Sequence, residues 1–268
     1  MVSQRGPQEL AKLPWPRDPA PVVTDDMPIR SRSNAKLKLL AAVQGGKERA
    51  WIALEGERLV ADALQAGVAV DLLFAAPARA ELVERIRTRV GQVAWVDAEL
   101  LGRASTLEHS DGVIALARPP SRPPLCELPQ HERVLLLVAA GVADPGNLGA
   151  LARSAEALGA TGLCPIGGAN PMGVKALRGS MGSLLRLPLY HANSAALAAE
   201  ELRARGIRQV AAATRGGKSP EHFDWTGPLA LWISGETGPQ PEDGLDFETL
   251  TVPMVASVES LNVGVAAA

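Results

Sequence analysis

The chain has 268 residues, 47% of them hydrophobic, and a formal net charge of −2, which allows two modest domains and argues weakly against a surface coated with nucleic acid. No stretch could cross a bilayer, the first thirty residues carry no apolar signal segment, and two cysteines are too few for a disulfide framework. The sequence therefore predicts a cytoplasmic protein with no membrane partner, and its four scattered histidines predict no metal site.

The N-terminal region contains a proline-rich arm followed by a basic segment. Residues 1–28 carry six prolines and no sustained hydrophobic periodicity, which predicts a flexible arm. Residues 30–49 contain six Lys or Arg residues and a single acidic residue, Glu48. A solvated helix face is the ordinary explanation of a charge run, whereas the one-sided sign favours contact with phosphate groups. The leading candidates for phosphate contact are Arg30, Arg32, Lys36 and Lys38.

Residues 29–118 show the alternating patterns of a small α/β unit. The predicted strands are 70–76, 92–97 and 111–118, and an amphipathic helix is predicted at 80–91. In residues 53–67 the helical spacing places four apolar side chains on one face before Gly67 ends the helix, namely Leu59, Val60, Ala63 and Leu64. The Pro-rich residues 119–131 predict a linker to a second unit.

Residues 132–268 repeat the alternation on a larger scale. Helices are predicted at 147–160, 173–183 and 194–206. The predicted strands are 133–142, 162–166, 185–190, 207–214, 229–236 and 250–255. The first of these is an almost continuous apolar run, which is typical of a parallel strand covered on both faces. This order predicts an α/β fold with a mostly parallel open sheet, in which ligands bind at the carboxyl ends of the strands.

The loop after the first of these strands carries polar residues on a tight turn. Pro145 and Gly146 fix the turn, Asn147 is placed to cap the following helix, and Arg153 lies within that helix. A helix cap and a surface cation that covers apolar atoms would explain the last two equally well.

Three other loops lie at the same predicted sheet edge. Residues 232–241 contain Gly235 and Glu236 but match neither the phosphate-loop nor the dinucleotide fingerprint, and alone they suit a plain turn. Residues 214–218 add a flexible loop with Thr214 and Gly216. At the C-terminus, Ser260 can cap a helix that starts at Leu261, and Asn262 can brace a neighbouring loop. Glycines and short polar side chains predict a pocket for a small, largely uncharged ligand, which suits an adenosine better than a triphosphate.

These loops resemble the three signature motifs of the SpoU/TrmH family of SPOUT RNA 2'-O-ribose methyltransferases. DPGNLGALARSAEALGA resembles the first motif, SGETG the second, and VPMVASVESLNVGVAAA the third. LRGSMGSLLRLPLY resembles the segment between the first two motifs, and ALEGERLVADAL resembles the family's substrate-binding domain. The resemblance implies a trefoil knot in residues 132–268, S-adenosylmethionine as methyl donor, and a homodimer with its site at the subunit interface. The sequence departs from the family at Gly264, where many members have Ser, and it ends sooner after the last alanines.

The resemblance also implies roles for individual residues. Arg153, Asn147 and Asn262 match positions at the methyl-transfer centre, with Arg153 stabilising the developing alkoxide and Asn147 orienting Arg153 or the ribose. Gly235, Val252 and Leu261 match cofactor-contacting positions. Glu236 and Ser260 resemble supporting residues of that pocket, and Thr214 and Gly216 are added from the fourth loop. The basic segment would hold RNA, helped by Arg178 and Arg186.

The function implied is methylation of a ribose 2'-hydroxyl in structured RNA, with large-subunit (23S) rRNA favoured over tRNA because of the two-unit layout. Three alternatives stay open at this point. One is a tRNA 2'-O-methyltransferase, and another is a non-catalytic RNA-binding protein of the same fold, which the acidic total and the early C-terminus favour slightly. A nucleotide-binding oxidoreductase is disfavoured because the dinucleotide fingerprint is missing.

Overall fold

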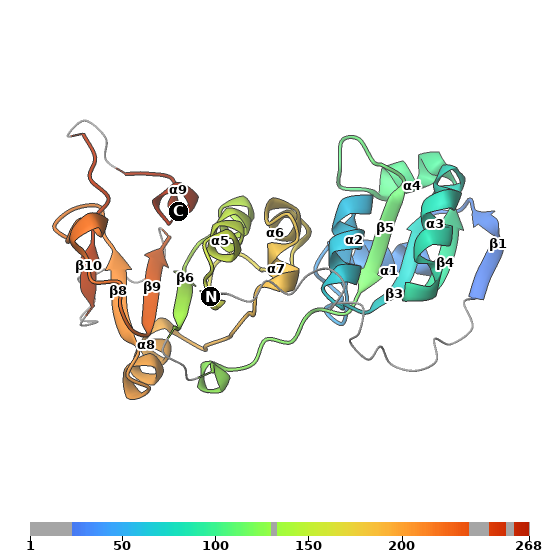
Figure 1. Ribbon diagram of the computed structural model, residues 1–268. Coiled ribbons are helices and arrows are strands. Elements are labelled where there is room, and N and C mark those ends of the chain that lie inside the picture. The colour runs from blue at the N-terminus through green and yellow to red at the C-terminus, as the bar shows by residue number, and fades with distance from the viewer. Residues whose placement is uncertain (1–22, 130–132, 236–246, 256–259, 268) are drawn as a thin grey trace.

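The computed structural model describes residues 23–129, 133–235, 247–255 and 260–267. Two units, each built on a five-stranded sheet with helices packed against it, are joined by an extended segment around residue 120 (Figure 1). No helix among these described residues is long and apolar enough to span a membrane.

The first unit is a mixed sheet with the strand order β1-β4-β3-β5-β2. The strands β1, β4 and β3 are parallel, whereas β5 runs antiparallel to both β3 and β2. The strands are β1 Val23–Ile29, β2 Ile52–Glu55, β3 Val70–Ala75, β4 Val90–Val96 and β5 Val113–Ala117. The helices are α1 Ala35–Gln44, α2 Glu57–Gln65, α3 Ala80–Ile86 and α4 Ala98–Ala104, with 3₁₀ turns η2 Pro77–Arg79 and η3 Arg87–Arg89.

The start of this unit differs from the sequence prediction. Residues 23–28 were assigned to the flexible arm, but they belong to β1, which pairs with β4. Proline is compatible with this strand because β1 is at the edge of the sheet and has a neighbour on one side only. The helix α2 agrees with its prediction, since the four apolar residues of its expected face are buried. Gly67 follows it with a φ of +75°, a conformation that glycine adopts without strain.

The second unit is an all-parallel sheet with the strand order β10-β8-β9-β6-β7. Its strands are β6 Leu135–Ala140, β7 Gly162–Ile166, β8 Arg208–Ala212, β9 Leu229–Ser234 and β10 Glu248–Leu250. Its helices are α5 Pro145–Ala157, α6 Val174–Gly179, α7 Ser183–Arg186, α8 Ala195–Ala204 and α9 Val263–Ala266, with 3₁₀ turns η4 Leu125–Glu127 and η5 Pro220–His222. The interior strand β6, which lies between β9 and β7, is buried on both faces, which confirms the interpretation of its apolar run.

Three predicted elements of the second unit are wrong in detail. The helix expected over 173–183 ends as α6 at Gly179, and after a turn in which Met181 and Gly182 have positive φ, the separate helix α7 begins at Ser183. The strand expected over 185–190 makes only an isolated bridge at Leu189, because Pro188 has no N–H for a ladder. The last strand, expected over 250–255, is β10, and it ends at Leu250.

The trefoil knot remains a prediction, because residues 236–246 and 256–259, on which its path depends, lie outside the described residues.

The two units meet through α6 and α7 of the second unit and β2 and α2 of the first (Figure 1). Their apolar side chains form one continuous core cluster. An ion pair of 3.6 Å between Arg186 in α7 and Asp62 in α2 also crosses this interface. Helix α6 packs on α5 as well, so it lies between the first unit and the helix that carries Asn147.

Candidate functional site

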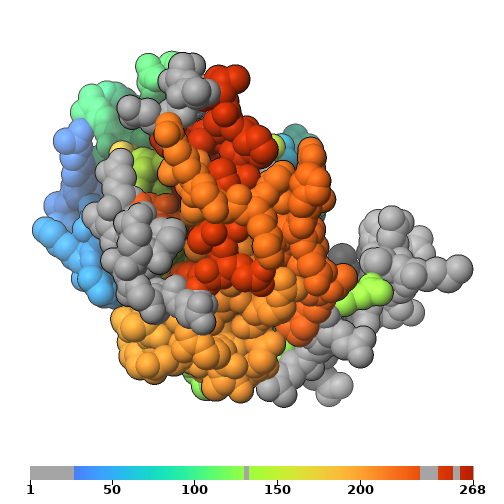
Figure 2. Space-filling model, turned by 90° about the vertical axis from the view of Figure 1, so that its left-hand side faces the viewer, coloured from blue at the N-terminus to red at the C-terminus, as the bar shows by residue number. Residues whose placement is uncertain are grey.

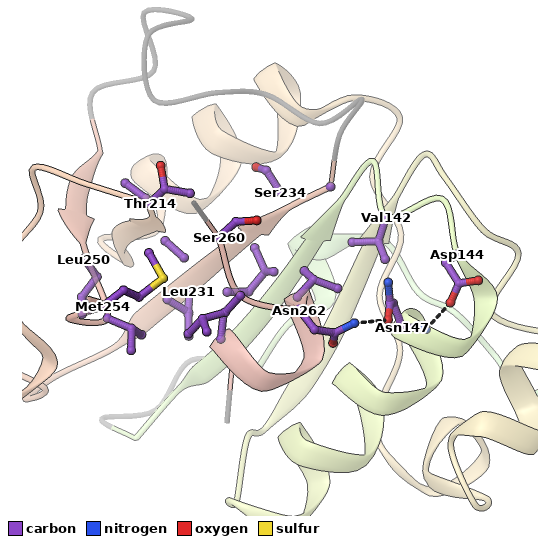
Figure 3. Close-up of a pocket in the computed structure, with 18 of the residues that line it drawn as sticks. Val142, Asp144, Asn147, Thr214, Leu231, Ser234, Leu250, Met254, Ser260 and Asn262 are labelled. Carbon is purple, nitrogen blue, oxygen red and sulfur yellow. Dashed lines mark hydrogen bonds between the residues drawn. The ribbon is translucent and has the colours of Figure 1, made fainter. Parts of the chain in front are cut away.

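A cavity of about 560 Å³ opens at the carboxyl edge of the parallel sheet (Figure 3). Residues that directly follow β6, β8, β9 and β10 line it, and α9 closes one side. Because all these strands run in the same direction, their carboxyl ends and the loops behind them converge at this point. The polar lining residues are Asp144, Asn147, Thr214, Ser234, Ser260 and Asn262, and the apolar ones include Val142, Leu231, Leu250, Met254 and Leu261.

Glycine at position 235 allows the strand ends to approach closely. A Cβ atom there would lie 2.3 Å from the carbonyl oxygen of Gly141 and 2.8 Å from Cα of Val142. Both contacts are far below van der Waals distance, and both are with backbone atoms. The ends of β9 and β6 could therefore not pack as they do with any larger residue at this position, and the cavity wall depends on Gly235.

The two asparagines of the site are joined by a hydrogen bond. Asn262 Nδ2 donates to Asn147 Oδ1 at 3.0 Å, while Asn262 Oδ1 accepts from the backbone N–H of Gly264 at 2.9 Å and caps α9. The bond links α9 to α5, so Asn262 braces the first turn of a helix rather than the neighbouring loop that the sequence predicted. Two capping predictions are wrong: Asp144, not Asn147, caps α5, and Asn262, not Ser260, caps α9, which begins two residues later than expected.

The structure brings most of the predicted cofactor residues together. Thr214, Gly235, Val252, Ser260 and Leu261 all line the cavity, and so do Asn147 and Asn262. The lining does not include Gly216, which is exposed and has a φ of +80°. Glu236 lies outside the described residues.

Arg153 is exposed on α5 and does not line the cavity of its own chain. It lies three residues after Ala150, so the two are neighbours on the helix surface. A Cβ atom on Gly264 of α9 would be 3.1 Å from Cβ of Ala150, which shows how closely α9 packs on this side of α5.

The predicted RNA-contact residues lie at different places. Arg30, Arg32, Lys38 and Arg178 are exposed, and Lys36 is half-buried. The guanidinium of Arg186 instead donates two hydrogen bonds to the Glu156 carboxylate, at 2.7 and 2.8 Å. These bonds, with a weaker contact from Ser183, hold the pKa of Glu156 below its usual range, although partial burial acts in the opposite direction and raises it. The Arg186 guanidinium is thus occupied by neighbouring carboxylates.

Sequence reasoning missed several lining residues. Leu231, Leu250 and Met254 supply much of the apolar surface, but an apolar residue near a strand end has no distinctive signal. Asp144 did have a signal, because Asp before Pro at a helix start is a common capping pattern. None of the described lining residues is Lys or Arg, and the described residues contain no group of three or more His, Cys, Asp or Glu that could hold a metal ion.

Comparison with known proteins identifies the families of the two units. Residues 134–268 match the SpoU rRNA Methylase family, and residues 34–115 match the MRM3-like substrate binding domain. The 23S rRNA (guanosine(2553)-2'-O)-methyltransferase RlmP of Bacillus subtilis is 29% identical over 90% of this chain and 96% of its own length.

Two similar structures were solved with S-adenosylmethionine (AdoMet). The SpoU methyltransferase AviRb from Streptomyces viridochromogenes, in complex with AdoMet, has a TM-score of 0.77 and 28% identity, covering 87% of this chain and 94% of its own. An AdoMet-bound rRNA methyltransferase from Sinorhizobium meliloti has a TM-score of 0.79 and 25% identity, covering 90% and 94%. Because the family match includes just over half of the chain and all the loops that line the cavity, the protein belongs to the SpoU rRNA Methylase family.

Proposed function

We propose that this protein is an AdoMet-dependent enzyme that methylates a ribose 2'-hydroxyl in 23S rRNA. The observation that carries the proposal is the cavity at the carboxyl edge, closed by the Asn147–Asn262 pair, in a chain of the SpoU family. Two similar proteins, RlmP of Bacillus subtilis and a uridine 2'-O-methyltransferase of Streptomyces viridochromogenes, are named for methylation of 23S rRNA. A cytoplasmic location, which the two unpaired cysteines favour, would bring the enzyme together with its substrate.

The cavity suits AdoMet in size and chemistry. Its volume of about 560 Å³ lies within the range of small-molecule sites, and its lining is mostly apolar with a few short polar groups. The absence of cations from the described lining suits an adenosine better than a polyphosphate. When bound, AdoMet supplies a methyl group already activated by a sulfonium. Leu231, Leu261 and Met254 would hold and desolvate the cofactor, and Thr214 and Ser260 offer hydroxyls for hydrogen bonding.

We further propose that Arg153 acts in the cavity of a partner subunit. Arg153 is exposed outside its own cavity, and an arginine serves this reaction only near the ribose oxygen. Four apolar side chains in the described C-terminal segments are also exposed, namely Val252, Val255, Leu261 and Val265. Figure 2 shows the red C-terminal part of the chain at the surface, bordered by orange segments. A two-fold dimer that covers this surface would bury them and bring Arg153 of each subunit to the other's site.

The first unit, residues 29–118, is proposed to bind the RNA. Arg30, Arg32 and Lys38 are exposed beside or on α1 and can reach phosphates, whereas Arg186 pairs with Glu156 and Asp62 instead. A 2'-hydroxyl target requires RNA rather than DNA. RNA affinity should fall steeply with salt, because each released phosphate counterion contributes to the slope. A flat salt dependence would remove the basic segment from this proposal.

The test is incubation with tritiated AdoMet and separate pools of unmodified 23S rRNA, 16S rRNA and tRNA, followed by mapping of the labelled ribose. Label in the 23S pool alone is expected, and label in tRNA alone would show that the substrate is wrong. The Arg153→Ala variant should lose turnover and keep AdoMet affinity in calorimetry. Activity within about tenfold of wild type would remove Arg153 from the reaction.

Mixing two inactive variants tests the dimer. Arg153→Ala leaves a cavity without its arginine, and Leu261→Trp fills the cavity but keeps Arg153. If the arginine comes from the partner, each mixed dimer has one complete cavity out of two. Random exchange makes about half of the dimers mixed, so the sample should recover roughly a quarter of wild-type activity. No recovery from subunits shown to exchange would place Arg153 in its own chain's site or outside the site.

A further inference from the structure

One described residue lining the cavity has an ionisable side chain, Asp144. It directly precedes α5 and lies at the end of the cavity marked by Asn147 and Asn262, away from Met254 and Leu250 (Figure 3). The sequence prediction assigned it no role. Its position at this end of the cavity matters because Asn147 and Asn262 are the lining residues that the resemblance implies for the methyl-transfer centre.

The two oxygens of the Asp144 carboxylate differ in their bonding. Oδ1 accepts the backbone N–H of Asn147 at 2.7 Å and caps α5. Oδ2 accepts no hydrogen bond from any residue in the described part of the chain. Gly146 keeps one side of the carboxylate open, since a Cβ atom there would lie 3.0 Å from Oδ1. Asp144 is exposed, so a proton on it could pass to water.

The proposed reaction needs a group that takes a proton. The ribose oxygen forms a bond to the methyl carbon with a lone pair, the carbon–sulfur bond breaks with its electron pair returning to sulfur, and the O–H proton must leave. A guanidinium is a poor acceptor because it is already protonated and gives up its proton only at very high pH. A carboxylate within reach of the hydroxyl is a suitable general base.

We propose that Asp144 is the general base of this enzyme. Oδ2 receives the 2'-hydroxyl proton as the carbon–oxygen bond forms, and the proton then passes to solvent. Oδ1 stays on the Asn147 N–H and keeps the carboxylate in place. The cation stabilises the developing oxyanion and the carboxylate removes the proton, so the two roles belong to different side chains. This inference rests on the proposed methyltransferase function.

The competing explanation is that Asp144 is only a helix cap. Substitutions that keep the cap but cannot accept a proton distinguish this explanation from a general base. Asn and Ser cap helices about as well as Asp, but neither accepts a proton near neutral pH. Asp144→Asn and Asp144→Ser should therefore keep the thermal midpoint and the AdoMet affinity of the wild type, whereas a loss of capping would lower both. Asp144→Ala, which removes the cap as well, calibrates the structural effect.

The decisive measurement is single-turnover methylation of unmodified 23S rRNA by wild type, Asp144→Asn and Asp144→Ser, with calorimetry of AdoMet binding and thermal unfolding on the same samples. The rate should fall about 100-fold or more with unchanged affinity for AdoMet and RNA. The residual rate should rise about tenfold per pH unit, because hydroxide then removes the proton.

Three results would overturn the role of Asp144. They are a rate for Asp144→Asn within about threefold of wild type, a loss of AdoMet binding in proportion to the loss of rate, or an unchanged pH dependence. Glu236→Gln, measured in parallel, provides a comparison. If its methylation rate falls strongly while Asp144→Asn stays active, Glu236 rather than Asp144 is the general base. If the wild type itself transfers no methyl group to any RNA pool, the proposed function fails rather than this assignment.

Discussion

The contact between α5 and α6 predicts that Gly→Ala lowers the stability of the protein at one position of this interface and leaves it nearly unchanged at another. A Cβ atom at Gly149 would lie 2.7 Å from the backbone carbon of Gly179 and 2.7 Å from the nitrogen of Ser180. Both obstacles are backbone atoms of or next to α6, so relief requires the helices to separate by almost 1 Å. Overpacking of this kind costs about 1–3 kcal/mol, and the gain in helix propensity returns at most about 1 kcal/mol. Gly149→Ala should therefore lower the free energy of unfolding by about 1–2 kcal/mol.

The opposite glycine of the same interface is the matched control. A Cβ atom at Gly179 would have its nearest neighbours at 3.5 Å, which is ordinary van der Waals contact. Gly179→Ala should stay within about 0.5 kcal/mol of the wild type or be slightly more stable. Urea unfolding followed by tryptophan fluorescence, to which Trp232 in the core of the second unit contributes, would compare the three proteins. Equal stability of Gly149→Ala and Gly179→Ala would refute the argument from backbone contact.

Three further predictions concern the site, a buried thiol and the interface. Asn262→Asp keeps the cap of α9 but cannot donate a hydrogen bond to Asn147 Oδ1, so the methylation rate should fall about tenfold or more in the tritium assay. An unchanged rate would show that this hydrogen bond is not needed for methylation. Burial raises the pKa of the Cys164 thiol to about 12, so at pH 8 a thiol reagent should label the exposed Cys126 and leave Cys164 intact until the chain is unfolded. The hydrogen bond from Arg186 lowers the pKa of Glu156, which makes the pair stabilising at neutral pH and weaker as the carboxylate is protonated. Glu156→Gln should lower the thermal midpoint at pH 7, and the difference from wild type should close toward about pH 3; a difference independent of pH would contradict this.

Much of the fold and of the cavity could be predicted because the signals are local. The apolar run of β6 and the helical face of α2 each follow from a repeat within a few residues. The three motifs located Gly235, Leu261 and Asn262 at one edge of the sheet, where the structure has them.

The predictions that failed depend on neighbours that are distant in sequence. Which residue caps α5 depends on where the helix begins, and Asp144 and Asn147 are equally good caps by type. The ion pairs of Arg186 join three segments far apart in the chain, so its basic character alone could not tell a phosphate contact from an internal one. β1 was missed because the proline content of its segment conceals an edge strand.

The position of α6 between β2 and α5 has a consequence for how a target nucleotide is chosen. Because the first unit, which is proposed to bind the RNA, is attached through this short helix and the Arg186–Asp62 ion pair, its separation from Asn147 is set by packing rather than by the Pro-rich connection. This packing fixes the distance between the first unit and the cavity. The enzyme would select its ribose by the distance from a structural landmark on the folded RNA, and sequence around the modified nucleotide would matter less than the helix that carries it.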